Sequence, residues 1–388
     1  MICRLLKIIY SHDHHDVQSV EVKTLASGSD IKGNLSDCGR LAISVKTYGG
    51  AKHNYNWFVK IQPQNHQNSA LLSEFNLFEN EIEFYQKIAP ELLEFVEEFK
   101  AEGTEIKFDI PELIYAEVDD DHAIIILEDL VGAGYKQAKD VNGEKYLSKA
   151  NAILAVESVA KIHAASYALQ VKKNIDLGVI HPNLELSGLL WTNEEMTSRL
   201  SNMKDYYCDI LRQSDKPDSP ILVDRFQKTF DSLEKLKEIT RQRVSSSDYN
   251  GINCLQQGDF HFNNLMFKEE MDGSISVKIV DWQMAYTGRA GGDIAYLLMS
   301  SLAPQLYETD EENIKEKYFD MFNETFCSLI KEKEDEVEEM LEQDYHDSLP
   351  LGFLFSCGNV MNSNQLDRKK TVSFAYHLCN EAAIRNLI

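Results

Sequence analysis

The part of the chain whose residue types are best suited to chemistry runs from residue 256 to residue 283, QQGDFHFNNLMFKEEMDGSISVKIVDWQ. Asp259 is followed five residues later by Asn264, and a strand–turn–strand pattern then leads to Asp281. Phosphoryl transfer uses such a set, because one carboxylate positions the attacking hydroxyl and accepts its proton, while an amide oxygen and a second carboxylate hold Mg²⁺ against the nucleotide phosphates. We therefore predict that Asp259 is catalytic and that Asn264 and Asp281 bind the metal.

Residues nearer the start of the chain would supply the nucleotide site. Lys60 lies in a predicted strand after a glycine-containing loop that includes Gly33, and from there its ammonium group can reach the α- and β-phosphates. Glu81 lies in the following helix, where it can pair with Lys60. A hinge between the two parts of the chain is expected at Glu128, Asp129 and Leu130. This order of parts matches the two-lobed protein-kinase scheme, with ATP and Mg²⁺ as cofactors.

Each of these residues also has a purely structural interpretation. Asp259 and Asn264 can cap a strand, and Lys60 can be an exposed strand residue. Glu81 can be one of several solvated acids, since Glu79 and Glu83 are its neighbours. The occurrence of the full set in one order favours the functional interpretation for all of them.

Several short segments resemble one protein family. They are FVKIQP, the spacing F-x-x-E-x-x-x-Y that ends at Tyr85, LEDL, AKIHAAS, GDFHFNNLMF, KIVDWQ and GGDIAYLL. Together they are similar to the ecdysteroid kinase-like family, which is related to the choline kinase and aminoglycoside phosphotransferase enzymes. The resemblance runs from about Leu25 to the end of the chain. It implies phosphorylation of a hydroxyl on a small molecule, with steroid hormones of the ecdysteroid type as the best-known acceptors.

The resemblance implies the same roles for the residues named above. It also implies that the hinge at Glu128, Asp129 and Leu130 contacts the adenine of ATP, and that Asp293, in GGDIAYLL, braces the catalytic loop. It also shows departures. Gln257 stands where the family usually has histidine, and His261 replaces a usual tryptophan, which leaves His261 open as either a pocket wall or a substrate contact. The motif Asp281-Trp282-Gln283 lacks the glycine of a DFG motif, which predicts a constitutively formed site without a glycine-hinged switch.

Three further features are expected to be structural. His163 is predicted to be a hydrogen-bonded core histidine. Arg289 can stabilise negative charge beyond the metal site, although a surface ion pair with an acid is favoured. The apolar run Leu351–Phe355 is favoured as core over a steroid pocket.

The elements that must position these residues follow from periodicity. Alternation predicts strands at about 20–25, 40–48, 57–61, 113–118 and 123–127. Helical spacing predicts a helix from about residue 71 to 88, with Pro90 just beyond its end. Further helices are predicted from about 147 and over 198–213, 223–243 and 311–343, around a strand pair at 264–268 and 276–281.

These elements predict an α+β, bilobal protein-kinase-like fold. A small antiparallel β-sheet lobe with one helix, residues 1–130, would bind the nucleotide. A larger, mainly helical lobe, residues 131–388, would carry the catalytic and acceptor-binding groups.

Composition limits the partners. The chain of 388 residues has 39 basic and 63 acidic residues, a net charge of −24, which argues against nucleic acid and anionic membrane surfaces. Its seven cysteines form no CxxC pair, which favours reduced thiols and a cytoplasmic location over disulfides or zinc. No run approaches the roughly 18 apolar residues of a membrane span. The cluster His12, His14 and His15 is interpreted as a solvated loop.

Three functions stay open at this point. The favoured one is a kinase of a steroid-like alcohol. A kinase of another small acceptor, such as a xenobiotic, a glycoside or an aminoalcohol, is the second. A non-catalytic nucleotide-binding protein is the third, suggested by Gln257 and by the irregular loop around Gly33.

Overall fold

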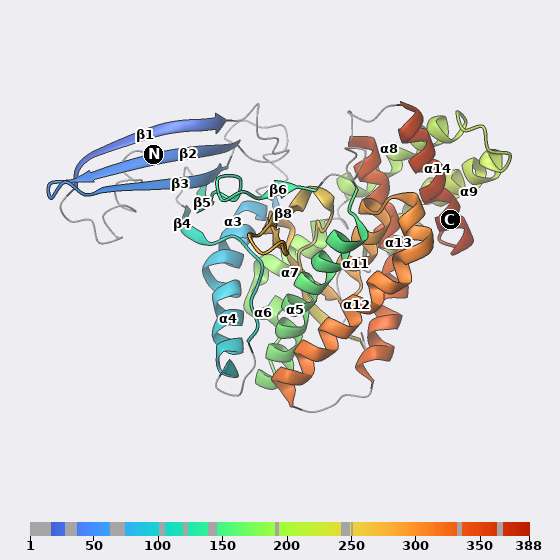
Figure 1. Ribbon diagram of the computed structural model, residues 1–388. Coiled ribbons are helices and arrows are strands. Elements are labelled where there is room, and N and C mark those ends of the chain that lie inside the picture. Colours follow the sequence, from blue (N-terminus) through green and yellow to red (C-terminus); the bar gives the residue numbers. More distant parts are fainter. Residues whose placement is uncertain are drawn as a thin grey trace.

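The structure is a computed structural model (Figure 1). It describes residues 17–27, 37–62, 74–100, 105–118, 123–138, 146–190, 194–241, 249, 251–331, 336–362 and 368–388. Gly33, the loop that contains it and the cluster His12, His14 and His15 lie outside these residues. The described chain has an antiparallel sheet near its start and a mostly helical remainder, which confirms the predicted α+β, bilobal class (Figure 1).

The N-terminal sheet has five antiparallel strands in the order β1-β2-β3-β5-β4. Alternating apolar residues such as Leu41, Ile43 and Val45 place one side of β2 in a buried layer, as a period of two requires. In Figure 1, β1, β2 and β3 extend beyond the helical body. The strands are β1 (Val17–Ser27), β2 (Asp37–Thr47), β3 (Lys52–Ile61), β4 (Leu113–Val118) and β5 (Ala123–Glu128).

The helix between β3 and β4 is longer than expected. It comprises α3 (Leu77–Glu83), a π-helical turn η1 (Phe84–Ile88) and α4 (Ala89–Glu97). The prediction that the helix ends before Pro90 is therefore wrong. Proline is tolerated in the first turn of a helix, and Pro90 lies there in α4, directly after the π-helical turn has shifted the hydrogen-bond register.

The remainder of the chain is built around α5 (Lys149–Lys173), which packs lengthwise against α12 (Figure 1). Among the described residues α5 is the one helix long and apolar enough to cross a membrane, but 72% of its most apolar window is buried inside the protein. It is thus a core helix. The other helices are α6 (Leu177–Ile180), α7 (Pro182–Leu189), α8 (Glu194–Leu211), α9 (Ser219–Asp231), α10 (Leu233–Arg241), α11 (Gly292–Ser301), α12 (Pro304–Ile330), α13 (Val337–Asn362) and α14 (Arg368–Ile384).

Two of the predicted helices are each two helices. The helix expected over 223–243 is broken between α9 and α10, because Ser232 adopts an extended backbone. The helix expected over 311–343 covers parts of α12 and α13, and α12 ends where Lys331 adopts a left-handed conformation, with φ of 64°. Hydrophobic period alone did not locate these breaks, since both neighbouring segments bury apolar faces in the same core.

Short strands connect the two lobes and the site. The predicted strand pair is present as β8 (Leu265–Glu269) and β9 (Ile275–Ile279), joined to the two-residue strand β6 (Lys136–Gln137). A second pair consists of β7 (Asn253–Gln256) and β10 (Tyr286–Arg289).

The run Leu351–Phe355 in α13 is buried in the main hydrophobic cluster, which confirms it as core.

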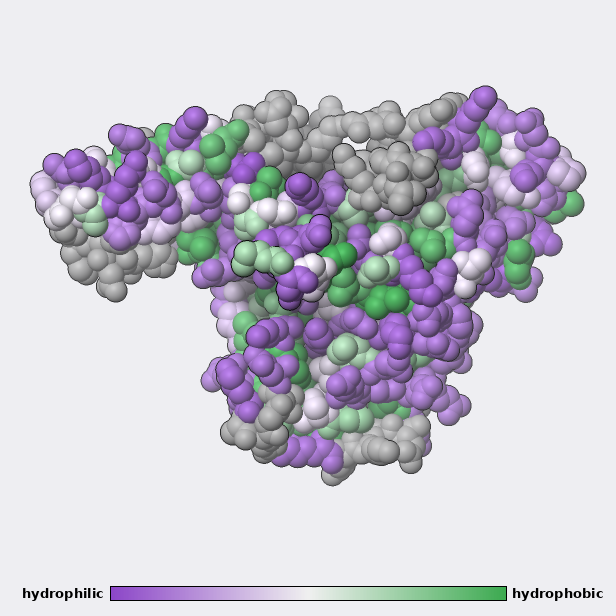
Figure 2. Space-filling view, in the orientation of Figure 1, coloured by the Kyte–Doolittle hydropathy of each residue, from purple (hydrophilic) through white to green (hydrophobic). Residues whose placement is uncertain are grey.

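The surface of the molecule is predominantly hydrophilic on the face shown in Figure 2, over the helical body as well as over the sheet. This agrees with the net charge of −24, which is carried mainly by solvated side chains.

Candidate active site

Lys60, Glu81 and Asp281 come together at the junction of the sheet with the rest of the chain. Lys60 in β3 donates from Nζ to Glu81 Oε2 at 2.5 Å and to Asp281 Oδ1 at 2.7 Å. Residues 60 and 281 are 221 positions apart, so the fold alone brings them into contact. The predicted pairing of Lys60 with Glu81 is therefore present, with Asp281 as a second anion.

Burial sets the electrostatics of this group. Lys60 and Glu81 are 5% and 1% exposed. Burial lowers the pKa of Lys60, but the attraction of Asp281 and Glu81 outweighs it and raises the pKa above its ordinary value. Burial raises the pKa of Glu81 to about 7, against the opposing attraction of Lys60. Lys60 therefore stays cationic.

Asp259 lies in a short loop after β7 and accepts three hydrogen bonds from two neighbours. Asn264 Nδ2 donates to Asp259 Oδ2 at 3.0 Å and to its main-chain oxygen at 2.8 Å. The hydroxyl of Tyr296, in α11, donates to Asp259 Oδ1 at 3.3 Å. These bonds fix the carboxylate, whose side chain is still 35% exposed and thus accessible to a substrate.

The antiparallel ladder of β8 and β9 explains why the two predicted metal ligands share one end of the hairpin. Leu265 pairs with Ile279, and the amide of Val280 donates to the main-chain oxygen of Asn264 at 3.0 Å. Asn264 and Asp281 therefore flank the same end of the ladder. Because Asn264 uses its Nδ2 on Asp259, its amide oxygen is the atom that can bind a cation. An amide oxygen beside a carboxylate is a donor set that suits Mg²⁺.

Gln257 links the loop that contains Asp259 to the end of β9. Its Nε2 donates to the main-chain oxygens of Val280 at 3.0 Å and Asp281 at 2.6 Å, while its Oε1 accepts from the amide of Asp259 at 2.8 Å. Glutamine at this position therefore makes three structural hydrogen bonds. This geometry supports the interpretation that Gln257 does not inactivate the site.

Asp293 braces the same loop from α11. Its carboxylate accepts from the amides of Gln257 at 2.6 Å and Gly258 at 3.0 Å. His163 lies 3.3 Å from Asp293 and 2.8 Å from the hydroxyl of Tyr318, and it is fully buried. His163 is therefore a hydrogen-bonded core histidine, as expected.

His261 lies beside Asp259. Its Nε2 is 3.5 Å from Asp259 Oδ2, and its ring packs on Tyr296 with 5.6 Å between centroids. The ring of Tyr296 in turn meets Phe355 edge to face at 5.6 Å. The side of the site next to Asp259 is thus largely aromatic.

The hinge contains an ion pair that the sequence did not indicate. Asp129 is 5% exposed, and its carboxylate accepts two hydrogen bonds from the guanidinium of Arg40, at 2.8 and 2.7 Å. Glu128 lies 3.7 Å from Lys278, and Leu130 donates its amide to the main-chain oxygen of Glu128 at 3.1 Å. Because the Asp129 carboxylate is bound by Arg40 of β2, residue 129 would contact the base of a nucleotide through its main chain.

Arg289 lies outside this group. It donates to Asp347 at 2.5 Å and stacks over the ring of Tyr249. It therefore forms the favoured surface ion pair.

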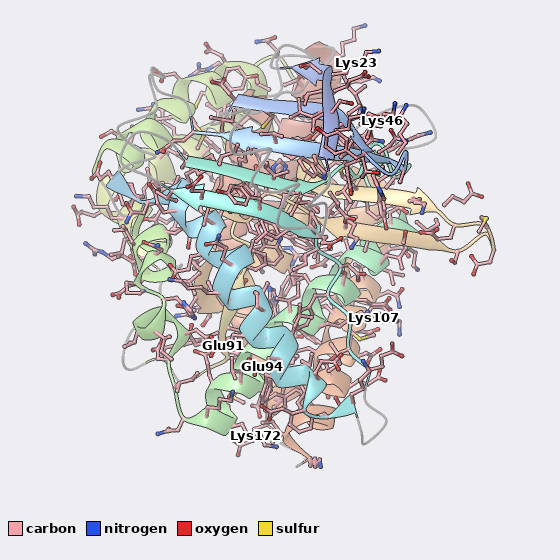
Figure 3. All side chains as sticks on the ribbon, turned by 90° about the vertical axis from the view of Figure 1, so that its left-hand side faces the viewer. Lys23, Lys46, Glu91, Glu94, Lys107 and Lys172 are labelled. Atoms are coloured by element: carbon pink, nitrogen blue, oxygen red, sulfur yellow. The ribbon has the colours of Figure 1, made fainter. Side chains whose placement is uncertain are left out.

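Sequence reasoning missed the residues that fasten the helix of Glu81 to the large lobe. His181 bridges Glu83 and Glu91 at 3.2 Å each, and Asn183 donates to Glu83 at 2.7 Å. Figure 3 shows Glu91 on α4, beside the helices that follow α5. Since these partners are 90 to 100 positions apart, no local pattern could have identified them.

Residues 32–331 match the sequence model of the ecdysteroid kinase-like family, a range that includes every candidate residue above. Similar solved structures include choline kinase from Cryptosporidium parvum Iowa II, at 12% identity and a TM-score of 0.43, covering 99% of this chain and 98% of that chain. The GDP complex of an aminoglycoside 2′-phosphotransferase IIIa mutant has 13% identity and a TM-score of 0.42, with the same coverage of 99% and 98%. No curated protein sequence matches the chain.

Proposed function

Because the chain belongs to the ecdysteroid kinase-like family, we propose that this small-molecule kinase transfers the terminal phosphate of ATP to a hydroxyl group of a steroid-like alcohol. The observation that carries the proposal is the grouping of Lys60, Glu81 and Asp281 opposite a fixed Asp259–Asn264 pair. These are the parts that phosphoryl transfer needs, and they come from segments far apart in the sequence.

Each group has a task in the proposed reaction. Lys60 offsets the charge of the α- and β-phosphates, and Glu81 holds its ammonium in place. The acceptor hydroxyl is oriented by Asp259, which takes its proton as the oxygen attacks the phosphorus. Asn264 and Tyr296 keep the Asp259 carboxylate in position for this step.

Asn264 and Asp281 are the proposed ligands of Mg²⁺, which when bound would neutralise the phosphate oxygens. The oxygen donors fit this ion, as described above. The protein's net charge of −24 makes such local neutralisation necessary, since the protein as a whole repels a polyanionic nucleotide.

The surroundings of Asp259 support a neutral, apolar acceptor. The rings of His261 and Tyr296 pack together beside the partly exposed Asp259 carboxylate, and aromatic neighbours of this kind favour an apolar, ring-containing acceptor over a charged one. An ecdysteroid-type alcohol has this character, whereas a strongly cationic acceptor would be matched better by a carboxylate-lined wall. We further propose that the enzyme works in the cytoplasm, where ATP is abundant.

An acceptor panel tests this proposal. The purified protein is incubated with ATP and Mg²⁺ and with ecdysteroids, plant glycosides, aminoalcohols or aminoglycosides in separate reactions, and phosphorylated products are identified by mass spectrometry. We expect a product that is one phosphate heavier in the ecdysteroid reactions. Product only from a cationic acceptor would refute the steroid assignment, and no product from any acceptor would refute the kinase itself.

A further inference from the structure

Asn80, the residue before Glu81 in α3, contacts the metal-binding segment from the opposite side. Its side chain is fully buried, and its Nδ2 donates to the main-chain oxygens of Gln283 at 3.0 Å and Ala285 at 2.8 Å. Both hydrogens of the amide are therefore used on the turn that follows Asp281. The turn is the 3₁₀ segment η5 (Trp282–Met284).

An aromatic contact fixes the same turn a second time. The rings of Phe84 and Trp282 are stacked, with 4.0 Å between centroids and 4° between planes. Both side chains are buried, and the Trp282 indole also donates to the main-chain oxygen of Ile279 at 3.2 Å. Trp282 is thus held between the Glu81 helix and the strand that leads into the metal site.

The backbone of Asp281 explains why such contacts are needed. Asp281 has φ of 61° and ψ of 68°, a left-handed conformation that is unfavourable for a residue with a β-carbon. Such a conformation persists only where the surroundings determine it. Asn80 and Phe84 hold the residues immediately after Asp281 in place. On the other side, the side-chain amide of Gln257 donates to the main-chain oxygens of Val280 and of Asp281 itself.

We propose that Asn80 is a positioning residue that holds the Asp281 carboxylate in the orientation that binds metal. It acts through the main chain at Gln283 and Ala285 and does not touch the nucleotide. Its neighbour Glu81 fixes Lys60, so one turn of α3 sets both the cation and the metal-binding anion of the site. This inference rests on the proposed function, in that Asp281 is taken to be a metal ligand.

The test measures metal binding, which requires no knowledge of the acceptor. Mn²⁺ binding is followed by electron paramagnetic resonance in the presence of a non-hydrolysable ATP analogue, for the wild type, Asn80→Ala and Asp281→Asn. We expect the dissociation constant of Mn²⁺ to rise about fivefold to tenfold in Asn80→Ala and binding to be lost in Asp281→Asn. The affinity for the metal-free analogue should stay within about twofold of wild type in Asn80→Ala.

Gln170→Ala is the matched control. Gln170 is also a buried helical amide whose Nε2 donates to two main-chain oxygens, those of Ser166 at 3.2 Å and Asn253 at 2.9 Å, but it does not contact the turn after Asp281. Asn80→Ala and Gln170→Ala should lower the melting temperature similarly, and only Asn80→Ala should weaken Mn²⁺ binding. If Asn80→Ala fails to fold, Phe84→Leu takes its place, with a smaller shift in the same direction expected.

The outcomes distinguish a failure of the role proposed for Asn80 from a failure of the proposed function. An unchanged Mn²⁺ affinity in both Asn80→Ala and Phe84→Leu, with wild-type binding intact, would overturn the role of Asn80 alone. Equal weakening in Gln170→Ala would overturn it as well, because the effect would then be general destabilisation. Absence of Mn²⁺ binding to the wild type with its nucleotide analogue would overturn both this inference and the proposed function.

Discussion

Lys60 illustrates how a single residue gains its properties from the fold. It is one of two lysines on its strand, but in the folded protein it is buried and lies between two carboxylates, Glu81 and Asp281. A buried ammonium keeps its charge only when anions are close enough to replace water. The position is therefore incompatible with an ordinary exposed strand lysine.

The replacement Lys60→Met tests this residue. We expect the dissociation constant of ATP to rise at least about tenfold, because the cation proposed to offset the charge of the phosphates is removed. Stability should fall by about 3–5 kcal/mol, since a buried carboxylate is left unpaired. Isothermal titration calorimetry and urea unfolding measure the two effects. Wild-type ATP affinity in a folded Lys60→Met variant would contradict the assignment.

At the scale of elements, the ion pair of Arg40 with Asp129 joins β2 to the hinge. Arg40 and Asp129 are 89 positions apart in the sequence, and the guanidinium of Arg40 donates two hydrogen bonds to the Asp129 carboxylate. Strand β2 is thereby fixed against the segment that links β5 to the helical part of the chain.

Arg40→Met is expected to destabilise the protein by about 2–4 kcal/mol, because the Asp129 carboxylate is buried and loses its partner. Adding Asp129→Asn should recover a substantial part of this loss, since the uncompensated charge is removed. Urea unfolding of the wild type, the two single variants and the double variant gives the coupling energy. Strictly additive effects would show that the two side chains do not act as a pair.

The same scale shows how far sequence reasoning reached. The five strands of the N-terminal sheet, α5 and the β8–β9 hairpin were predicted because each has a period that its own residues display, whereas the short strands β6, β7 and β10 were not predicted. The continuation of the helix past Pro90 was not predicted, because it depends on a π-helical turn that no side-chain pattern indicates. Arg40, Asn80 and His181 were missed for a related reason, namely that their partners are distant in the chain. Glu81 and Asp281 were found because the order of chemical parts identified them.

On the scale of the whole molecule, the C-terminal helix α14 packs against α8, α9 and α13 and contacts the start of α12, and a partly buried histidine lies at that contact. His377 in α14 is 3.6 Å from Glu308, with its ring edge-on to Tyr307, and Glu381 and Arg385 are the other charged groups nearby. Burial lowers the pKa of His377 below its ordinary value, against the attraction of Glu308. The neutral imidazole is therefore the form that packs here.

This predicts how stability depends on pH. The unfolded chain takes up a proton at His377 near its ordinary pKa of about 6.5, whereas the folded protein does so only at lower pH. Stability should therefore fall as the pH drops below about 6.5, and the fall should be smaller in His377→Gln. Urea unfolding at pH 7.5 and at about pH 5.5 checks this. The same loss in both proteins would show that His377 does not contribute.

The most direct test of the account concerns Asp259, because the kinase assignment requires this carboxylate to act on the acceptor hydroxyl. In the acceptor reaction that yields product, Asp259→Asn should lower kcat by about 10²–10⁴-fold, as expected for the loss of a general base. ATP affinity should stay within about threefold of wild type, since Asp259 is not among the proposed nucleotide contacts. Wild-type turnover by a folded Asp259→Asn protein would contradict the account at its centre.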